Sequence, residues 1–481
     1  MARLAAYLTD DAPTHGGRVL SYVYDSGRPE LDALAGAAAA AVQAVNGLDP
    51  TTFPSVARLE SDLVRFAREM LHGPTATGSV TSGGTESCLL AVLAAREQWR
   101  RRHAAGAQPG TVRPLIVLPA SAHAAFHKAA HLFDLDLILV PVDAATGVPS
   151  VAEMVEAMDA AGDALALVVV SAPSYPHGVL DPIVEVAAAA RTRDLPCHVD
   201  ACIGGWVLPW WGAAGGDPLP PWDFAVPGVT SISADLHKYG FAPKGASLLL
   251  FSDPALDRAR YFALTDWPGY PVVNPTLLGS RSATSLAAAW AVVQALGPGG
   301  YVELTRPTVR ATAAVRAAVE SIDGLRILGE PVGPLLAVAA DLDTSGAVRA
   351  DAVDPHAWAT AVARAGFVLQ GQPAFGLIPR STHLTITPVT ERVLAELIPV
   401  LIAAADEVRG APERAEAAGA IPDPAQLAAA ARAGGELDLA SVLALIEMLP
   451  REQSAGLLTA FLAEFVAPPA GSDGQSTGVE V

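Results

Sequence analysis

The sequence predicts an α/β fold, with a mostly parallel sheet in a large domain and a smaller α+β domain toward the C-terminus. From Gly78 to about residue 255, short apolar runs alternate with Ala-rich helical segments, a pattern typical of strand–helix–strand units. A further α+β portion follows, to about residue 408. Because 481 residues are too many for one compact core, we expect more than one folding unit.

The hydrophobic pattern gives the expected elements in order. Residues 30–72 form two helices, broken at Asn46–Pro54, and the second helix is amphipathic over Ser55–Leu71. The expected strands are Pro114–Leu118, Leu137–Val140, Leu165–Val170, Cys197–Val199 and Ser247–Phe251. The helices after the first two are Ser87–His103, His123–Leu132, Pro182–Arg193, 284–296 and 301–321. A linker at 412–424, a helical pair at Ala425–Phe465 and a Gly/Ser/Pro-rich end at Pro468–Val481 complete the chain.

Charge and hydropathy argue against several classes of partner. The formal net charge of −19 opposes general binding to nucleic acid or to an anionic membrane, although a local pocket can still hold a small anion. No apolar run is long enough to cross a bilayer and no secretory signal is evident, so we expect no transmembrane segment. The three cysteines, Cys88, Cys197 and Cys202, lack metal-site or redox spacing, which fits a reducing cytoplasm.

Lysine is rare in this chain, and one lysine lies in an unusual context. Of the 31 basic residues only Lys128, Lys238 and Lys244 are lysines. Arginine can replace lysine in ion pairs but cannot form an imine, because its guanidinium stays protonated. The count alone is equally compatible with codon bias. Lys238, however, follows an expected strand in Ser231-Ile-Ser-Ala-Asp-Leu-His-Lys-Tyr-Gly240, where burial and neighbouring positive charge favour the neutral amine that imine formation needs.

A glycine-rich loop, Thr81-Ser-Gly-Gly-Thr-Glu-Ser87, leads directly into an expected helix. The two glycines allow a sharp turn, and the helix N-terminus presents free N–H groups to an anion such as a phosphate monoester. The hydroxyls of Ser82, Thr85 and Ser87 could add donors. An ordinary capped helix start explains the same residues. A nucleotide-binding P-loop is disfavoured, because the glycine spacing differs and no Gly-Lys-Ser/Thr follows.

Two further positions suit a flat aromatic cofactor. Asp200 ends an apolar strand in His198-Val-Asp-Ala-Cys202, and acids at the carboxyl ends of such strands face the ligand crevice. An ionised Asp there can keep a pyridine nitrogen protonated, although a simple strand-end cap is the alternative. His123 begins a helix and could stack on a ring.

A metal site is a different reading of the same helix. His123, His127 and His131 follow at helical spacing, and histidines four residues apart can share one ion. No carboxylate or cysteine completes the set nearby, so we expect no metal here and a solvated helix face for the last two histidines.

In their order along the chain, these segments resemble the group II, decarboxylase-like branch of the fold-type I pyridoxal-phosphate enzymes. Within that branch the chain is most similar to the sphingosine-1-phosphate lyases, over roughly residues 20–410. The resemblance rests on long stretches: 121–130 (SAHAAFHKAA), 176–182 (PHGVLDP), 198–205 (HVDACIGG), 228–245 (GVTSISADLHKYGFAPKG), 266–267 (DW) and 279–281 (GSR).

The resemblance implies an aspartate aminotransferase-like fold and pyridoxal 5′-phosphate as the cofactor. It implies that Lys238 forms the Schiff base, that Asp200 pairs with the pyridinium nitrogen and that His123 stacks on the ring. These three would be the catalytic residues. The other cofactor contacts within one chain would be Gly84, Thr85, His237 and, at the cofactor edge, Ser171.

The resemblance also assigns residues to substrate binding and to the site of a partner subunit. Members of this fold are dimers with shared sites, so Gly279 and Ser280 would reach the cofactor phosphate of the neighbouring subunit. Lys244 and Tyr24 match the ligands of a substrate phosphate. One departure lies at Asn46-Gly-Leu-Asp-Pro50, where the lyases carry a histidine in Asn-Pro-Leu-His-Pro-Asp. Asp49 takes its place, so either the substrate lacks the phosphate or Asp49 points elsewhere, since like charges in a partly dry pocket repel.

Together these expectations define a cytoplasmic homodimeric enzyme. The parts would be an N-terminal segment (1–60), a large cofactor-binding domain (61–300), a small C-terminal domain (301–410), and a linker with a helical tail (411–481). The eukaryotic lyases carry an N-terminal membrane helix, and this sequence shows none. The expected reaction is retro-aldol cleavage of a β-hydroxy amine, such as a sphingoid base phosphate, to an aldehyde and phosphoethanolamine. Decarboxylation of an L-amino acid is the alternative, and a catalytically silent scaffold of the same fold is a third reading.

Overall fold

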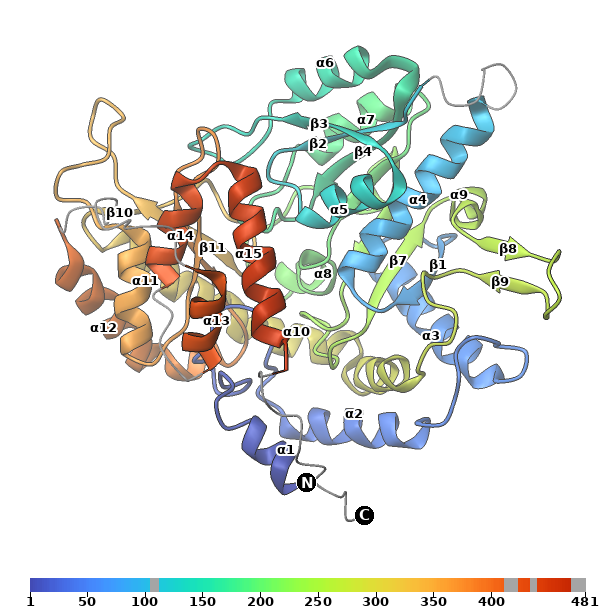
Figure 1. Cartoon of the computed structure of the whole chain (residues 1–481), viewed down its shortest axis with the longest axis horizontal. Helices are drawn as coiled ribbons and strands as arrows, with labels where there is room; N and C mark the ends of the chain where they lie inside the picture. The colour runs from blue at the N-terminus through green and yellow to red at the C-terminus, as the bar shows by residue number, and fades with distance from the viewer. Residues whose placement is uncertain (104–111, 411–422, 433–438, 469–481) are drawn as a thin grey trace.

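The computed structural model describes residues 1–103, 112–410, 423–432 and 439–468, and its centre is a seven-stranded sheet (Figure 1). The spatial order is β1-β7-β6-β5-β4-β2-β3. The strands are β1 (Thr77–Thr81), β2 (Leu115–Pro119), β3 (Asp136–Val140), β4 (Leu165–Ser171), β5 (Cys197–Asp200), β6 (Val229–Ala234) and β7 (Ser247–Phe251). β2 to β6 pair in parallel, while β7 runs antiparallel to both β1 and β6. The predicted α/β class with a mostly parallel sheet is confirmed.

Helices cover both faces of this sheet because its strands are apolar on both sides. Every residue of β4 is buried, with Val168 and Val170 facing one core and Val169 facing the other. α4 (Gly84–His103) and α5 (Ala124–Phe133) pack on one face, while α6 (Val151–Ala161) and α7 (Ile183–Thr192) pack on the opposite face. The turns from strands into α4 and α5 therefore meet at the carboxyl edge of the sheet.

A smaller antiparallel sheet follows, in the order β10-β11-β13-β12. Its strands are β10 (Leu325–Ile327), β11 (Leu335–Ala340), β12 (Gln370–Gln372) and β13 (Ser381–Thr385). It has its own apolar core, made with α11 (Pro355–Arg364) and α12 (Thr390–Val408). α10 (Thr284–Glu320) runs between the two sheets and is interrupted at Gly297, which precedes Pro298. This interruption matches the two predicted helices, 284–296 and 301–321.

The N-terminal helices pack beside the large sheet, and one hairpin forms a separate two-stranded sheet. α2 (Pro29–Ala41) packs along α10, and α3 (Pro54–Met70) packs against α10 and β1. The hairpin of β8 (Phe262–Leu264) and β9 (Val272–Asn274) projects from the body of the molecule (Figure 1). Short helices complete the list: α1 (Ala2–Tyr7), α8 (Leu208–Trp211), α9 (Pro254–Ala259), and the 3₁₀ turns Gly162–Ala164 and Gly204–Trp206.

The C-terminal tail differs from the prediction. The structure has three helices, α13 (Pro424–Arg432), α14 (Leu439–Met448) and α15 (Arg451–Val466), where the sequence predicted a helical pair. Pro450 caps the start of α15 and separates it from α14, because proline cannot continue a helix. Most of the predicted linker at 412–424 and nearly all of the predicted Gly/Ser/Pro-rich end lie outside the described residues.

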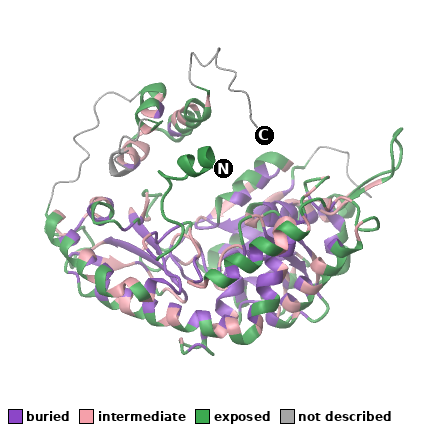
Figure 2. Ribbon diagram, turned by 90° about the horizontal axis from the view of Figure 1, so that it is seen from below, coloured by how far each residue is buried: buried purple, intermediate pink, exposed green. Residues whose placement is uncertain are grey.

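Burial follows this architecture. Buried residues gather in and around the two sheets, whereas α1 and the tail helices are mostly exposed or half-buried (Figure 2). Across the described part of the chain, no helix combines the length and apolar character needed to cross a bilayer.

Candidate active site

A cavity of about 390 Å³ lies at the carboxyl ends of β4, β5 and β6. Parallel sheets place ligand sites at this edge, because the loops that leave the strands can spread apart there. Segments far apart in the sequence line the cavity together. Seven of the predicted cofactor contacts are among the lining residues: Gly84, Thr85, His123, Ser171, Asp200, His237 and Lys238.

The glycine-rich loop forms one wall, between β1 and the start of α4. A side chain at position 84 would collide with its surroundings, since a Cβ there would lie 2.6 Å from the Asp235 carboxylate and 2.8 Å from Cys202 Sγ. Gly83 has a φ of +156°, where glycine is favoured. Glu86 fixes the loop by accepting a hydrogen bond from the backbone N–H of Ser82 at 2.6 Å. The first turn of α4 is thus held open toward the cavity.

Lys238 and Asp235 form an ion pair at the floor of the cavity. Lys238 Nζ lies 3.1 Å from Asp235 Oδ2, and the aspartate side chain is only 2% exposed. Burial alone would lower the pKa of Lys238, but the Asp235 carboxylate raises it well above its ordinary value. Burial would likewise raise the pKa of Asp235, but the charge of Lys238 lowers it overall. In this state Lys238 is therefore an ammonium ion.

His237 bridges this pair and the glycine-rich loop. Its Nδ1 accepts hydrogen bonds from the backbone N–H groups of Gly245 and Ala246, each at 3.3 Å. The ring therefore carries its proton on Nε2, which lies 3.4 Å from Asp235 Oδ2. Its Cε1 lies 3.2 Å from where a Cβ on Gly83 would be, so the imidazole reaches the loop. The proton-bearing nitrogen of His237 therefore faces Asp235, while the edge of the ring borders the glycine-rich loop.

Asp200 reaches the cavity from the end of β5. Its Oδ1 accepts hydrogen bonds from the hydroxyl of Ser233 at 3.2 Å and from the backbone N–H of Cys202 at 3.1 Å. The same serine oxygen lies 3.2 Å from His198 Nε2, and burial lowers the pKa of His198 to about 4. A neutral hydrogen-bonded layer thus supports the carboxylate from behind and leaves its other oxygen for a ligand.

His123 stands at the opposite wall, as the N-cap of α5. Its Nδ1 accepts a hydrogen bond from the backbone N–H of Ala125 at 3.2 Å, so the proton is on Nε2. The ring lies perpendicular to Tyr175, at 88° and 6.3 Å between centroids. The cap fixes the ring plane, which a stacking residue requires.

Comparison with known proteins now decides the family. Residues 21–338 match the pyridoxal-dependent decarboxylase conserved domain. The chain belongs to this family. The match contains every cavity residue named above, and the predicted cofactor, pyridoxal 5′-phosphate, is confirmed for this pyridoxal-dependent protein.

Individual relatives point to one branch. The chain is 39% identical over 333 residues to sphingosine-1-phosphate lyase 1 of Rattus norvegicus, a match that covers 69% of this chain and 56% of that protein. With the sphingosine-1-phosphate lyase of Saccharomyces cerevisiae it shares 38% over 289 residues, 60% of this chain and 48% of the relative. The matched part thus spans about half the length of these curated relatives.

Solved structures agree on the fold. The sphingosine-1-phosphate lyase of Burkholderia pseudomallei K96243 superposes with a TM-score of 0.76 at 35% identity, over 86% of this chain and 91% of that one. A glutamate decarboxylase from Lactobacillus brevis gives a TM-score of 0.72 at 21% identity, over 85% and 91%, which shows the shared fold alone. The predicted branch of the pyridoxal-phosphate enzymes is confirmed.

The chemistry of the cavity fits pyridoxal phosphate. It offers one primary amine at Lys238, backbone N–H groups at a helix start beside Gly84, and a carboxylate at Asp200. An aldehyde, a phosphate and a ring nitrogen need partners of these three kinds. The individual roles predicted for these residues stay predictions.

Two predicted substrate residues lie just beyond this cavity. Lys244 Nζ stands over the ring of Tyr24 at 4.8 Å and donates to the backbone oxygen of His237 at 3.2 Å. Burial raises the pKa of Tyr24 to about 12, so its hydroxyl stays protonated. An ammonium and a phenol therefore stand side by side next to the His237 turn.

Three predicted residues lie away from the cavity of their own chain. Gly279 and Ser280 occupy the segment before α10, where the Asn46 side chain donates to Ser280 Oγ at 3.2 Å. Asp49 is exposed and accepts hydrogen bonds from the hydroxyls of Thr51 and Thr52 at 2.6 and 2.8 Å, which lower its pKa to about 2. This arrangement places Asp49 outside the cavity of its own chain, and both alternatives for its role stay predictions.

The structure corrects one expectation and argues against one alternative reading. Ser87 cannot donate to a ligand, because its buried hydroxyl bonds to Thr81 at 2.8 Å and to Ser247 at 2.9 Å. In the described part of the chain, the ligand atoms of His123, His127 and His131 do not gather within metal-binding reach of one another.

Sequence reasoning missed Asp235, although the residue stood in the quoted motif. Its position three residues before Lys238 was the available signal, because an acid at that spacing can fold back onto the lysine.

Proposed function

We propose that this chain is a pyridoxal-phosphate-dependent carbon–carbon lyase. Its substrate would be a phosphorylated β-hydroxy amine, such as a sphingoid base phosphate, and retro-aldol cleavage would release an aldehyde and phosphoethanolamine. The observation that carries the proposal is the 35% identity to a bacterial sphingosine-1-phosphate lyase over 86% of this chain. The identity to curated lyases of the same name, 39% in the rat protein, supports it.

The residues of the chain suit this chemistry. When bound, pyridoxal phosphate supplies an electron sink for the electron pair left at Cα. Asp200 would hold a proton on the pyridine nitrogen, since its carboxylate is fixed by Ser233 and faces the cavity. His123 would orient the ring by contact with its face. Lys238 would be the lysine that attaches the cofactor, and Asp235, 3.1 Å from its Nζ, would hold the amine in the cavity.

A cationic pocket would select the substrate phosphate. Lys244 brings a positive charge next to the phenol of Tyr24, and both lie at the turn that carries His237 and Lys238. Ammonium-to-phosphate hydrogen bonds are charge-assisted and stronger than neutral ones. Asp49 does not oppose such a phosphate within its own chain, since its carboxylate is engaged by its own turn. The argument for amino-acid decarboxylation from Asp49 is therefore weaker than the sequence suggested.

Product analysis tests the proposal. The purified protein with added pyridoxal phosphate is incubated with a phosphorylated sphingoid base, with the same base lacking phosphate, and with a panel of L-amino acids. We expect a long-chain aldehyde and phosphoethanolamine in equal amounts from the first substrate alone. Release of carbon dioxide from an amino acid, with no aldehyde from any base, would contradict the lyase proposal and support amino-acid decarboxylation.

We further propose a homodimer in which Gly279 and Ser280 reach the partner's cavity. Exposed apolar side chains beside this segment support an interface, with Leu277 47% and Leu278 50% exposed. Light scattering gives the mass. If sites are shared, mixing inactive Lys238→Ala and Ser280→Trp variants restores part of the activity; a monomer, or no restoration, rejects the arrangement.

We also propose a cytoplasmic location. Cys88, Cys197 and Cys202 are all buried as free thiols, which suits a reducing compartment. Cell fractionation tests this, and recovery of the native protein in a membrane or secreted fraction would contradict it.

A further inference from the structure

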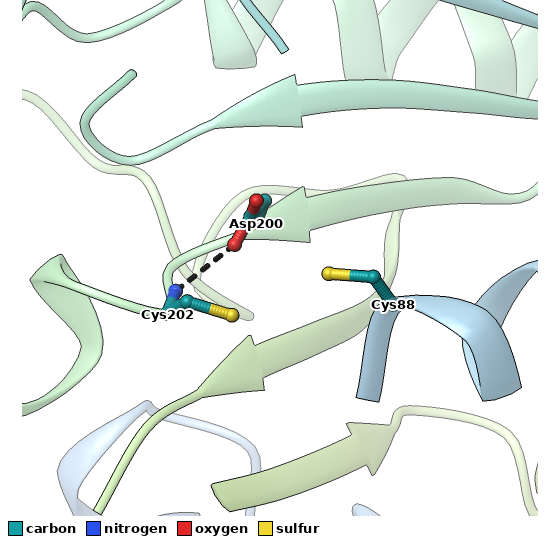
Figure 3. A group of neighbouring side chains, drawn as sticks. All are labelled: Cys88, Asp200 and Cys202. Atoms are coloured by element: carbon teal, nitrogen blue, oxygen red, sulfur yellow. Dashed lines mark hydrogen bonds between the residues drawn. The ribbon is translucent and has the colours of Figure 1, made fainter. Parts of the chain in front are cut away.

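The side chains of Cys88, Asp200 and Cys202 lie close together at the base of the cavity. The Sγ atoms of Cys88 and Cys202 and a carboxylate oxygen of Asp200 all lie within 4.8 Å of one another (Figure 3). Cys88 comes from the second turn of α4, Asp200 ends β5, and Cys202 lies in the turn that follows. Spacing along the sequence hid this group, because Cys88 lies more than one hundred residues before Cys202.

These three side chains are the donor set that soft divalent metals prefer. Zn²⁺ binds thiolates and carboxylates in tetrahedral sites, with Zn–S bonds of about 2.3 Å, so two sulfurs lie roughly 3.8 Å apart. The three ligand atoms lie within 4.8 Å of one another, so an approach of roughly 1 Å would bring them to the spacing of a metal site. Within the described ranges, no other three His, Cys, Asp or Glu side chains gather in this way.

A second layer already orients the ligands. Ser233 Oγ donates to Asp200 Oδ1 at 3.2 Å and accepts from Cys202 Sγ at 3.3 Å, and it lies 4.0 Å from Cys88 Sγ. Hydrogen bonds of this kind fix the orientation of side chains that bind a metal directly. Cys202 and Asp200 line the cavity, whereas Cys88 is 1% exposed and lies behind them. An ion can therefore enter through the cavity and keep one coordination position open toward it.

The charge balance also permits an ion at this depth. Cys88 and Cys202 are both free thiols. One Zn²⁺ that forms two metal–sulfur bonds displaces two protons, and the carboxylate keeps its charge. The net charge of the group remains −1, so the ion adds no buried charge, and no oxidant or reductant is needed.

We propose that Cys88, Asp200 and Cys202 form a site for a soft divalent metal such as Zn²⁺ in the cofactor-free chain, and that this metal and the cofactor exclude each other. The exclusion rests on the proposed role of Asp200, whose carboxylate cannot serve a metal and a pyridine nitrogen together. The metal would therefore be an inhibitor of cofactor loading.

Metal binding to the cofactor-free protein tests the site without any enzymatic activity. Reduced protein, with its three thiols verified by titration, is titrated with Co²⁺, whose thiolate charge-transfer absorption reports cysteine ligation, and Co²⁺ is then displaced with Zn²⁺. We expect one equivalent to bind to the wild type. Cys88→Ser should weaken binding at least roughly tenfold, as removal of even outer-shell partners does. Cys197→Ser is the matched control, because Cys197 is another buried thiol of β5 outside the group.

Three outcomes overturn the proposal. Absence of thiolate absorption in the wild type removes the site, and equal binding by wild type and Cys88→Ser assigns the metal elsewhere. Simultaneous full binding of Zn²⁺ and pyridoxal phosphate, measured by metal content and cofactor absorbance, rejects the exclusion. Failure of the lyase assay leaves the first two readouts unaffected, so the two hypotheses can fail separately.

Discussion

Asp235 Oδ2 lies 3.1 Å from Lys238 Nζ, in a pair whose acidic side chain is almost fully buried. The backbone makes this contact possible, because the N–H of Lys238 also donates to the carbonyl oxygen of Asp235 at 3.3 Å and closes a turn. Asp235 therefore raises the pKa of the lysine that we propose attaches the cofactor, a step that needs a neutral amine.

Replacement of Asp235 by Asn should make Lys238 easier to deprotonate. Asp235 raises the pKa of Lys238 against the effect of burial, so without the carboxylate burial prevails and the amine is neutral at lower pH. We expect the cofactor-free variant to bind pyridoxal phosphate faster than wild type at pH 7, with the pH profile of loading moved to lower pH in stopped-flow absorbance. Asp223→Asn, which removes a buried acid paired with His72 instead, should leave the profile unchanged. Identical profiles for Asp235→Asn and wild type would contradict this role.

Asp181 should make stability fall as pH rises through the neutral range. Burial raises its pKa from 3.8 to about 7. The unfolded chain therefore loses this proton first, and the folded state loses stability between about pH 4 and pH 7. Relative to Asp181→Asn, wild type should lose roughly 2–3 kcal/mol between pH 5 and 7.5. Denaturant unfolding of both proteins at several pH values measures the difference, and curves that stay parallel would show that Asp181 titrates normally.

His123 caps α5, and we propose that it also contacts the cofactor; two substitutions separate these roles. His123→Ala loses the hydrogen bond to Ala125, so the cofactor-free protein should lose roughly 0.5–2 kcal/mol. His123→Asn can keep the cap and should retain this stability. Both variants should bind pyridoxal phosphate more weakly than wild type, because both lack the ring. Wild-type cofactor affinity in either variant would exclude stacking by His123.

Lys244 should act on substrate phosphate rather than on the chemical step. Loss of a charge-assisted hydrogen bond costs roughly 1.5–3 kcal/mol, so Lys244→Gln should raise KM for a phosphorylated amine about tenfold or more, with little change in kcat. Lys128→Gln is the matched control, since Lys128 is exposed on α5. A parallel fall in kcat, or an equal effect from Lys128→Gln, would place Lys244 outside the phosphate site.

Much of the large sheet could be predicted from the sequence because its strands are buried on both faces. β4 and β7 are almost entirely apolar runs, so their composition and length identify them. β1 (Thr77–Thr81) is polar and glycine-containing, and its pairing with β7 depends on contacts across more than 160 residues, which no local pattern reveals.

The candidate site shows the same contrast between residues that local motifs identify and contacts that only the folded structure reveals. Lys238, Asp200 and the loop at Gly84 carry motifs, and the structure brings them to one cavity. The pairing of Asp235 with Lys238 required the geometry of the turn, since an acid at that spacing has many possible partners. Ser87 is the opposite case. The motif suggested that its hydroxyl could bind a ligand, but in the structure this hydroxyl is hydrogen-bonded to Ser247, which lies 160 residues away on another strand.

Covalent mapping of the cofactor tests the central claim most directly. With only Lys128, Lys238 and Lys244 as candidates, borohydride fixation of bound pyridoxal phosphate followed by peptide mass spectrometry identifies the attachment site without ambiguity. We predict a single modified lysine, Lys238. Modification of Lys244 or Lys128 in its place, or a protein that binds the cofactor but yields no modified lysine, would contradict the account.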